Sequence, residues 1–177
     1  MKTFTVRKGG GTDYAPGWHT NTISKASYGE YGDNKYIDVW FDSYNDNFKL
    51  RVYEKMNKEG EEFAISNLFR FANAGITDAL DSGDKNMVVK FDDDANGLVG
   101  KTIHVYYYKD KKGYTAVLNQ VAPTPFTNVA DTFTDKDTVY YKNKAESYYQ
   151  RFILPRIHKA TEGSAVNSMN TTGDIPF

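Results

Sequence analysis

Alternating apolar and polar positions from Lys35 to Lys55 predict two β-strands joined by a polar loop. Successive strand residues point to opposite sides of a sheet, so one side of this hairpin is expected to face a core. The residues predicted to face the core are Ile37, Val39, Phe41, Phe48, Leu50 and Val52. The opposite side carries rings and charges together: Tyr36, Asp38, Trp40, Asp42, Lys49, Arg51, Tyr53 and Lys55.

Three further stretches have strand-like patterns. Trp18–Tyr28 is predicted to be the first strand, and a turn at Gly32-Asp33-Asn34 separates it from the central hairpin. Gly100–Lys109 and Tyr114–Val121 are predicted to form a second hairpin, which Pro123 and Pro125 end. In its first strand an expected core set alternates with a second set: Ile103, Val105 and Tyr107 against His104, Tyr106 and Tyr108.

Two segments have helical spacing. Glu61–Ala74 has one apolar stripe, formed by Phe63, Ile65, Leu68, Phe69 and Ala72. Ile76–Lys85 is expected to hold a further helical turn, and Met87–Phe91 a short strand or an extended link. Asp135–Ile153 is predicted to be a second helix that Pro155 ends. The residues expected to pack it on the core are Val139, Tyr140, Tyr148, Phe152 and Ile153.

The order of these elements is three strands, a helix, two strands and a helix. This order predicts a mainly β protein with a five-stranded OB-like barrel, a helix between strands 3 and 4, a C-terminal helix and a flexible tail. A four-stranded sandwich with a packed helix would use the same elements. The predicted organisation is a flexible arm at 1–17, an OB-fold core at 18–125, a helical extension at 126–159 and a disordered tail at 160–177.

Composition limits the kinds of function. The net charge of the chain is −1, so any nucleic-acid site has to be a local basic patch. There is no cysteine, which excludes disulfides, cysteine-bound zinc and thiol nucleophiles and is compatible with a reducing cytoplasm. No apolar run reaches the ~18 residues that a membrane span needs, and the N-terminus does not resemble a signal peptide. We therefore expect a cytoplasmic protein that does not enter membranes.

Rings beside cations on one side of a sheet are typical of proteins that hold single-stranded nucleic acid, because bases stack on rings and phosphates meet cations. The candidate stacking residues are Tyr36, Trp40, Tyr53, Tyr106 and Tyr108. The candidate phosphate contacts are Lys25, Lys49, Arg51, Lys55, Lys109, Lys111 and Lys112. A simpler interpretation is that aromatic residues favour strands and that lysines keep an edge strand soluble.

Other functions have weaker signals in the sequence. A nuclease or other metal-dependent DNA enzyme needs a metal or a positioned base, yet His19, His104 and His158 share no metal-binding spacing. The segment Asp92–Gly97 begins like a calcium loop, but Ile103 occupies the twelfth position, where glutamate is required. A carbohydrate-binding or structural β module would not need the row of lysine and arginine. We expect no catalytic residue, no metal and no cofactor.

Four segments carry a resemblance to a known family: WHTNTISKASYGEYGDNKYIDVWFD, FKLRVYEK, FAISNLFRFANAGI and GKTIHVYYYK. They lie between Trp18 and Pro123 and resemble a phage family of OB-fold single-stranded DNA-binding proteins. The resemblance implies sequence-independent coating of single strands during phage replication or recombination in the host cytoplasm. A homo-oligomer is compatible with it.

The last residues, Asp174-Ile175-Pro176-Phe177, are similar to the C-terminal tip of bacterial single-stranded DNA-binding proteins. In that family the terminal phenylalanine and its carboxylate dock replication and repair enzymes. This chain departs from the pattern, because Thr171, Thr172 and Gly173 stand where more aspartates are usual. The resemblance implies a protein-docking role for Asp174, Ile175, Pro176 and Phe177.

Removal of Asp174–Phe177 is predicted to leave the fold and the affinity for DNA nearly unchanged, because the polar segment before the tip has little apolar surface to pack. Recruitment of a replication or repair enzyme should be lost. A pull-down from host extract with the full chain and with a chain lacking Phe177 measures this. Identical partners in both would remove the docking role, and a large fall in melting temperature would show that the tip belongs to the fold.

Overall fold

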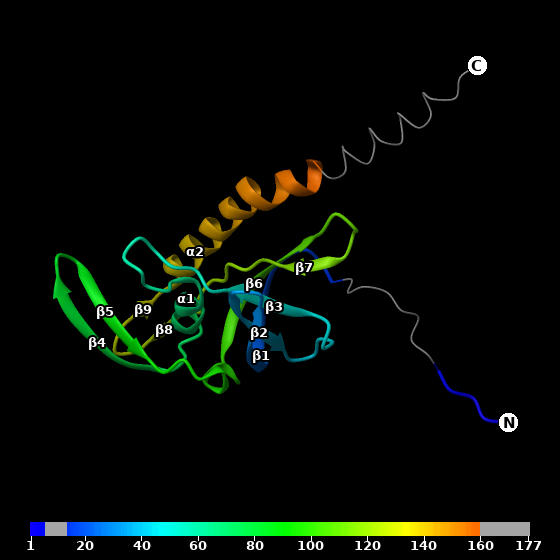
Figure 1. Cartoon of the computed structure of the whole chain (residues 1–177), viewed down its shortest axis with the longest axis horizontal. Helices are drawn as coiled ribbons and strands as arrows, with labels where there is room; N and C mark the ends of the chain where they lie inside the picture. The colour runs from blue at the N-terminus through cyan, green and yellow to red at the C-terminus, as the bar shows by residue number, and fades with distance from the viewer. Residues whose placement is uncertain (6–13, 160–177) are drawn as a thin grey trace, which may run out of the picture.

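The structure, a computed structural model, describes residues 1–5 and 14–159. Its main feature is an antiparallel sheet with the strand order β3-β2-β1-β6-β7 (Figure 1). The strands are β1 (Gly17–Tyr31), β2 (Asn34–Phe41), β3 (Lys49–Tyr53), β6 (Thr102–Lys109) and β7 (Thr115–Val117). The predictions of a mainly β protein and of both hairpins are therefore confirmed.

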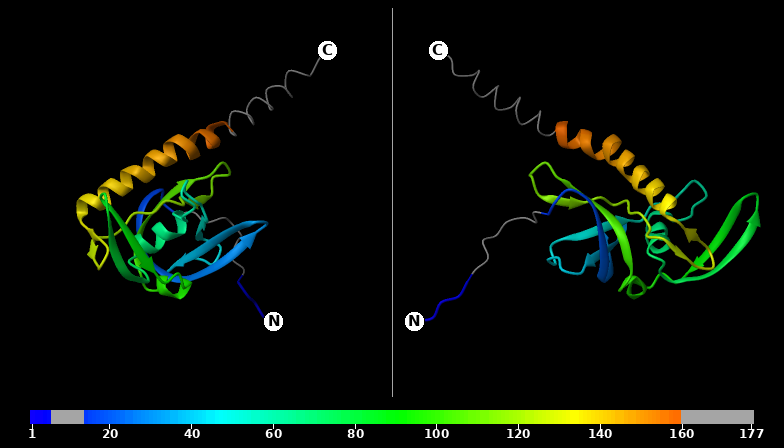
Figure 2. Two further views of the ribbon diagram at one scale, coloured as in Figure 1. Left: turned by 60° about the vertical axis from the view of Figure 1, so that its left-hand side comes forward. Right: turned by 180° about the vertical axis from the view of Figure 1, so that it is seen from behind.

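Strand β1 belongs to both halves of the sheet. Its first part, residues 17–22, pairs with β6, and its second part, residues 23–31, pairs with β2. The register shifts between Ile23 and Lys25, where the strand changes partner. Such a bulge bends a strand and changes which side chains point to each face. Figure 2 shows the resulting curvature of the sheet.

The core lies inside this curved sheet. Ile37, Val39 and Leu50 have no exposed surface, and Phe41, Phe48 and Val52 are buried. From β6, the three residues expected to face the core, Ile103, Val105 and Tyr107, are also fully buried. The face assignments read from the alternating pattern are therefore confirmed for both hairpins.

Strands β3 and β7 are the two edges of the sheet, which is not closed by a ladder between them. The N-terminal segment bridges the gap at Tyr14, within the predicted flexible arm. Its backbone N–H donates to the Thr115 hydroxyl at 2.9 Å, and its ring lies 4.8 Å from the rings of Tyr44 and Phe48. The aromatic ring thus packs residue 14 onto the core.

Helix α1 (Ala64–Phe71) confirms the predicted helix but is shorter. The Glu62 carboxylate accepts hydrogen bonds from the N–H groups of Ala64, Ile65 and Ser66, which satisfies the donors at the start of the helix. Ile65, Leu68, Phe69 and Ala72 are buried as expected. Phe63 precedes the first helical turn and is 42% exposed, so its assignment to the apolar stripe is wrong.

The helical turn predicted for Ile76–Lys85 is wrong. The segment is strand β4 (Ile76–Gly83), which pairs with β5 (Asn86–Phe91), so the short strand expected at Met87–Phe91 is confirmed. Asp84 and Lys85 both have positive φ, as a two-residue hairpin turn of this kind requires. The hairpin extends away from the main sheet (Figures 1 and 2).

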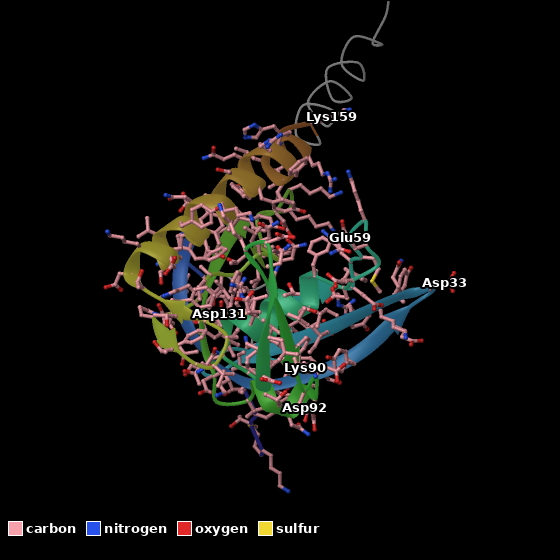
Figure 3. All side chains as sticks on the ribbon, turned by 90° about the vertical axis from the view of Figure 1, so that its left-hand side faces the viewer. Asp33, Glu59, Lys90, Asp92, Asp131 and Lys159 are labelled. Carbon is pink, nitrogen blue, oxygen red and sulfur yellow. The ribbon has the colours of Figure 1, made fainter. Side chains whose placement is uncertain are left out.

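The C-terminal part begins with a small hairpin, β8 (Phe126–Thr127) and β9 (Thr132–Phe133), which the sequence pattern did not predict. Helix α2 (Asp135–Tyr148) follows and continues as the π-helical turn η2 (Tyr149–Ile153). Pro155 does not end it, since the backbone stays helical to Lys159, which Figure 3 labels. The Leu154 N–H bonds to the Tyr149 carbonyl, and such wide turns accommodate irregularities within a helix.

Only two of the residues predicted to pack the C-terminal helix, Tyr148 and Ile153, are half-buried. Val139, Tyr140 and Phe152 are exposed, so their assignment to packing is wrong. Instead, the Tyr141 ring lies 4.5 Å from Phe71, and Ala145 is buried. The helix is polar on average and has no continuous apolar stripe, which is why periodicity misplaced its inner face. Within residues 1–5 and 14–159 no helix is both long enough and apolar enough to cross a membrane.

Truncation of Phe48 to alanine is predicted to lower the free energy of unfolding by ~3–5 kcal/mol, as for other buried phenylalanines. Its ring is 3% exposed and lies 4.9 Å from the Tyr107 ring. The matched control is Phe152→Ala, because Phe152 is 46% exposed. Urea denaturation of both variants measures the effect, and equal losses would contradict the assigned core.

Candidate nucleic-acid interface

The outward side chains of β1, β2 and β3 form three rows across the sheet. Strand register sets each row, because residues paired across antiparallel strands lie side by side. The rows are Lys25–Trp40–Lys49, Ser27–Asp38–Arg51 and Gly29–Tyr36–Tyr53. We call this surface the Trp40 face. It brings together six of the predicted site residues: Lys25, Tyr36, Trp40, Lys49, Arg51 and Tyr53.

In the first row Trp40 has a lysine on each neighbouring strand. The ammonium nitrogens of Lys25 and Lys49 lie 4.6 and 5.4 Å from the centroid of the Trp40 ring. The indole N–H donates to the Asp46 carbonyl at 2.8 Å, which fixes the ring. Two cation–π contacts therefore surround an oriented indole that keeps part of its surface in solvent.

The second row centres on Asp38, which is only 5% exposed. Arg51 donates two hydrogen bonds to its carboxylate, at 2.7 and 2.8 Å, and Lys49 lies at 3.4 Å. Burial alone would raise the pKa of Asp38, but the hydrogen bonds from Arg51 and the charge of Lys49 outweigh it and hold this pKa below its usual value. The same hydrogen bonds raise the pKa of Arg51. Asp38 thus fixes the two cations within the Trp40 face.

In the third row Tyr36 is tightly placed. The Arg51 guanidinium lies 3.8 Å from its ring centroid, and the Tyr53 ring packs edge-on at 5.5 Å. A Cβ atom added at Gly29 would lie 2.6 Å from the Tyr36 ring, so only glycine leaves room for the ring there. Tyr36 is half-buried, whereas Tyr53 at the sheet edge is 37% exposed and more accessible to a ligand.

Lys55 follows Tyr53 and is exposed beside the C-terminal helix. Its ammonium nitrogen lies 6.0 Å from the ring centroid of Tyr148 on α2. Lys144, on the same helix, lines a cavity together with Tyr53 and Lys55. Lys144 and Tyr148 are not among the residues predicted to bind nucleic acid, because nothing in their local sequence pattern shows that α2 passes the edge of β3.

The outward rings of β6 lie under the C-terminal helix and away from the Trp40 face. The Tyr149 ring lies 5.4 Å from Tyr106 and 5.3 Å from Tyr108. Burial raises the pKa of both β6 tyrosines. Trp18, which pairs with Tyr106, donates its indole N–H to the Glu146 carboxylate at 2.6 Å. The structure therefore separates Tyr106 and Tyr108 from the other predicted stacking residues.

The predicted lysines of the second hairpin occupy different environments. The Lys109 ammonium donates to the Thr115 hydroxyl at 2.9 Å, across the β6–β7 pair. Lys111 and Lys112 are exposed in the turn that joins these strands. The predicted docking residues Asp174, Ile175, Pro176 and Phe177 lie outside the described residues.

The acidic segment that resembles a calcium loop makes local hydrogen bonds. Asp92 accepts from the Asp94 N–H at 3.0 Å, and Asp94 accepts from the Asn96 N–H at 2.9 Å at the start of the 3₁₀ turn η1 (Ala95–Leu98). Across the described part of the chain, no three histidine or acidic side chains gather in a way that could hold a metal ion.

Neither a protein-family model nor a curated protein matches the sequence.

Replacement of Asp38 by asparagine is predicted to lower the free energy of unfolding at pH 7 by ~1.5–3 kcal/mol, the usual range for hydrogen bonds to a charged group. The lowered pKa means that the carboxylate stabilises the fold above the unfolded-state pKa, ~3.9, and that this stabilisation is lost as the pH falls through the folded-state pKa. The difference between wild type and variant should therefore shrink below pH 4. Urea denaturation at several pH values measures it.

The control for this prediction is Asp42→Asn, because Asp42 directly follows β2 and is exposed. It should change stability little at any pH. A difference for Asp38→Asn that stays constant from pH 7 to pH 2 would show that the carboxylate charge is not what stabilises the Trp40 face.

Proposed function

We propose that this protein binds single-stranded DNA, without base specificity, on the Trp40 face, and that it acts in phage DNA replication or recombination and not as an enzyme. The observation that carries the proposal is the first row, in which a partly exposed indole lies between two lysines. At the sheet edge, Tyr53 and Lys55 are both exposed and line the same cavity.

The energetics allow a base to replace the two lysines on Trp40. Two cation–π contacts at an exposed site are together worth ~1–2 kcal/mol. A base stacked on an aromatic side chain is worth ~1–3 kcal/mol, and the phosphate contacts of the released lysines add to it. A base that stacks on Trp40 brings its phosphate to Lys25 and Lys49, which lie within 5.4 Å of the ring centroid. Lys25 and Lys49 would then lose their cation–π contacts with Trp40 and gain ion pairs with the phosphate.

The connectivity supports an OB-like barrel as the framework of this face. In that fold, strand 1 is shared by two halves of a five-stranded sheet, a helix follows strand 3, and single strands bind across strands 2 and 3. The strand order β3-β2-β1-β6-β7, the divided pairing of β1 and the position of α1 after β3 agree with this arrangement. The open edge between β3 and β7 would correspond to the incomplete closure of a partly open barrel.

The predicted site residues would then have different roles. Trp40 and Tyr53 would stack bases, and Lys25, Lys49 and Lys55 would contact phosphates. Tyr36 and Arg51 would position the face, because Arg51 is held by Asp38 and Tyr36 by Arg51. Tyr106 and Tyr108 would anchor α2, and Lys109 would support the second hairpin. Lys111 and Lys112 would offer further phosphate contacts.

This arrangement explains why base specificity is not expected. Contacts to phosphates position a strand without reading its sequence, and stacking accepts every base. Asp38, the acidic residue at the centre of the face, accepts hydrogen bonds from Arg51, so its carboxylate is already engaged. Recruitment of replication or repair enzymes by Asp174–Phe177 remains part of the proposal.

Trp40→Ala and Tyr53→Ala are each predicted to weaken binding to an oligothymidine roughly 5- to 100-fold, the equivalent of one lost base stack. Tyr140→Ala is the matched control, because Tyr140 is a 60% exposed ring on α2 that is not part of the Trp40 face. Fluorescence anisotropy with a labelled oligonucleotide measures affinity, and circular dichroism checks that each variant is folded.

The same titration should show weak binding to duplex DNA and an affinity for single strands that falls with salt, since phosphate contacts release counterions. Equal affinity for duplex and single strand at moderate salt would refute the proposal. Unchanged affinity in both Trp40→Ala and Tyr53→Ala would refute the Trp40 face as the contact surface.

A further inference from the structure

A cavity of ≈ 300 Å³ lies at the open edge of the sheet, next to the Trp40 face. Its walls come from the end of β3, from α1, from the segment after β7 and from α2. The side chains that matter here are Tyr53, Lys55, Phe63, Asn67, Asn119 and Lys144. Aromatic rings, side-chain amides and lysines therefore surround one space.

Asn119 contributes an unpaired hydrogen-bond acceptor to the lining of this cavity. Its side-chain oxygen is buried and has no hydrogen-bond partner among the described residues. Buried polar atoms almost always have a partner, because an unpaired one forfeits the hydrogen bonds that it makes with water in the unfolded chain. Asn119 lines the cavity, and a turn of its side chain toward the cavity would let this unpaired oxygen accept a hydrogen bond from a ligand that carries an N–H donor.

The cavity continues the proposed path of the DNA strand. Tyr53 ends the third row of the Trp40 face and lines the cavity, and Lys55 lies just beyond it. Lys144 supplies a second exposed cation from α2. The guanidinium of Arg70, which also lines the cavity, is held by Asp131 through hydrogen bonds of 2.6 and 2.9 Å. The two lysines are thus the cations best placed to meet a phosphate there.

We infer that this cavity receives one nucleobase of the bound strand, turned out of the stack beside Tyr53, with its ring against Phe63 and an N–H group donating to the Asn119 oxygen. The inference rests on the proposed function. A cavity near the lower end of the usual range for small-ligand sites, ~300–1,000 Å³, fits one base and not a run of nucleotides. For thymine the donor is the imino group at N3, and cytosine, adenine and guanine offer amino groups.

A larger cavity of ≈ 570 Å³ provides the contrast. It lies near the start of α1 and is lined by Glu30, Glu54, Glu62 and Asp93, with Lys35 as its cation. Its carboxylates would repel phosphate. The cavity beside Tyr53 is therefore the one whose chemistry matches a nucleotide.

The test compares two oligonucleotides of equal length: oligothymidine, and the same chain with every thymine methylated at N3. Methylation removes the imino donor but keeps the charge of the strand and the aromatic ring. Wild type should bind the methylated strand roughly 5- to 100-fold more weakly, the effect expected when a buried acceptor stays unpaired. Asn119→Leu, which has an apolar side chain of similar size, should bind both strands equally.

The Trp40→Ala variant should keep the wild-type ratio between the two strands while binding both more weakly. Equal wild-type affinity for both strands, or an Asn119→Leu variant that still discriminates, would overturn the base pocket and leave the Trp40 face intact. If wild type binds neither strand, the proposed function and the pocket both fall.

A second variant covers the case in which Asn119→Leu does not fold. Phe63→Ala removes a half-exposed ring that lies outside the core. It should weaken binding to oligothymidine roughly 5- to 100-fold. Phe152→Ala, which removes an exposed ring on η2, should have no effect. Equal affinities for Phe63→Ala and wild type would overturn the inference.

Discussion

The change of partner in the middle of β1 is the constraint on which the rest of the structure depends. At the bulge, the Ile23 N–H donates to the Lys101 carbonyl and the Ile23 carbonyl accepts from the Gly100 N–H, while the next residues turn to β2. The bulge also changes which alternate residues of β1 face the core. Trp18 and Thr20 point outward before it, and Lys25 and Ser27 point outward after it, so Ile23 and Ala26 both reach the core. Strand β1 therefore contributes side chains to two outer faces of the sheet, one over β6 and the other the Trp40 face.

The two outer faces differ in the contacts that hold their aromatic rings in place. On the β6 side, the C-terminal helix covers the rings of Trp18, Tyr106 and Tyr108: Tyr149 of η2 packs on the two tyrosines, and Glu146 and Lys142 of α2 contact Trp18. The rings of Trp40 and Tyr36 are instead held by cations of neighbouring strands, and these contacts keep the rings in order without a covering helix. A surface that is ordered in the unbound protein loses less conformational entropy on binding, which favours affinity.

The sequence predicted those features that depend on local periodicity. The core and outer sides of the central hairpin follow from strict alternation, and Ile37 and Trp40 lie where the pattern placed them. The change at Ser24 in which alternate residues face the core has no such signal, since a bulge interrupts the pattern instead of repeating it. Strand β4 was missed because its apolar residues are few and its pairing with β5 depends on the Asp84–Lys85 turn. The C-terminal helix that covers Tyr106 could not be placed from the sequence, because the helix is polar and no apolar periodicity marks its inner face.

Charge is distributed unevenly between the Trp40 face and the larger cavity near the start of α1, and this distribution reconciles a net charge of −1 with the proposed binding of DNA. Lysine and arginine outnumber acids on the Trp40 face, whereas Glu30, Glu54, Glu62 and Asp93 line the larger cavity. Exposed charges are screened beyond ~10 Å at moderate salt, so a strand close to the sheet responds to the nearest side chains more than to the whole chain. The acids at the larger cavity then disfavour a path there. If the protein binds DNA as proposed, the balance of charge that removes long-range attraction still leaves a local preference for the surface that holds Trp40 and Tyr53.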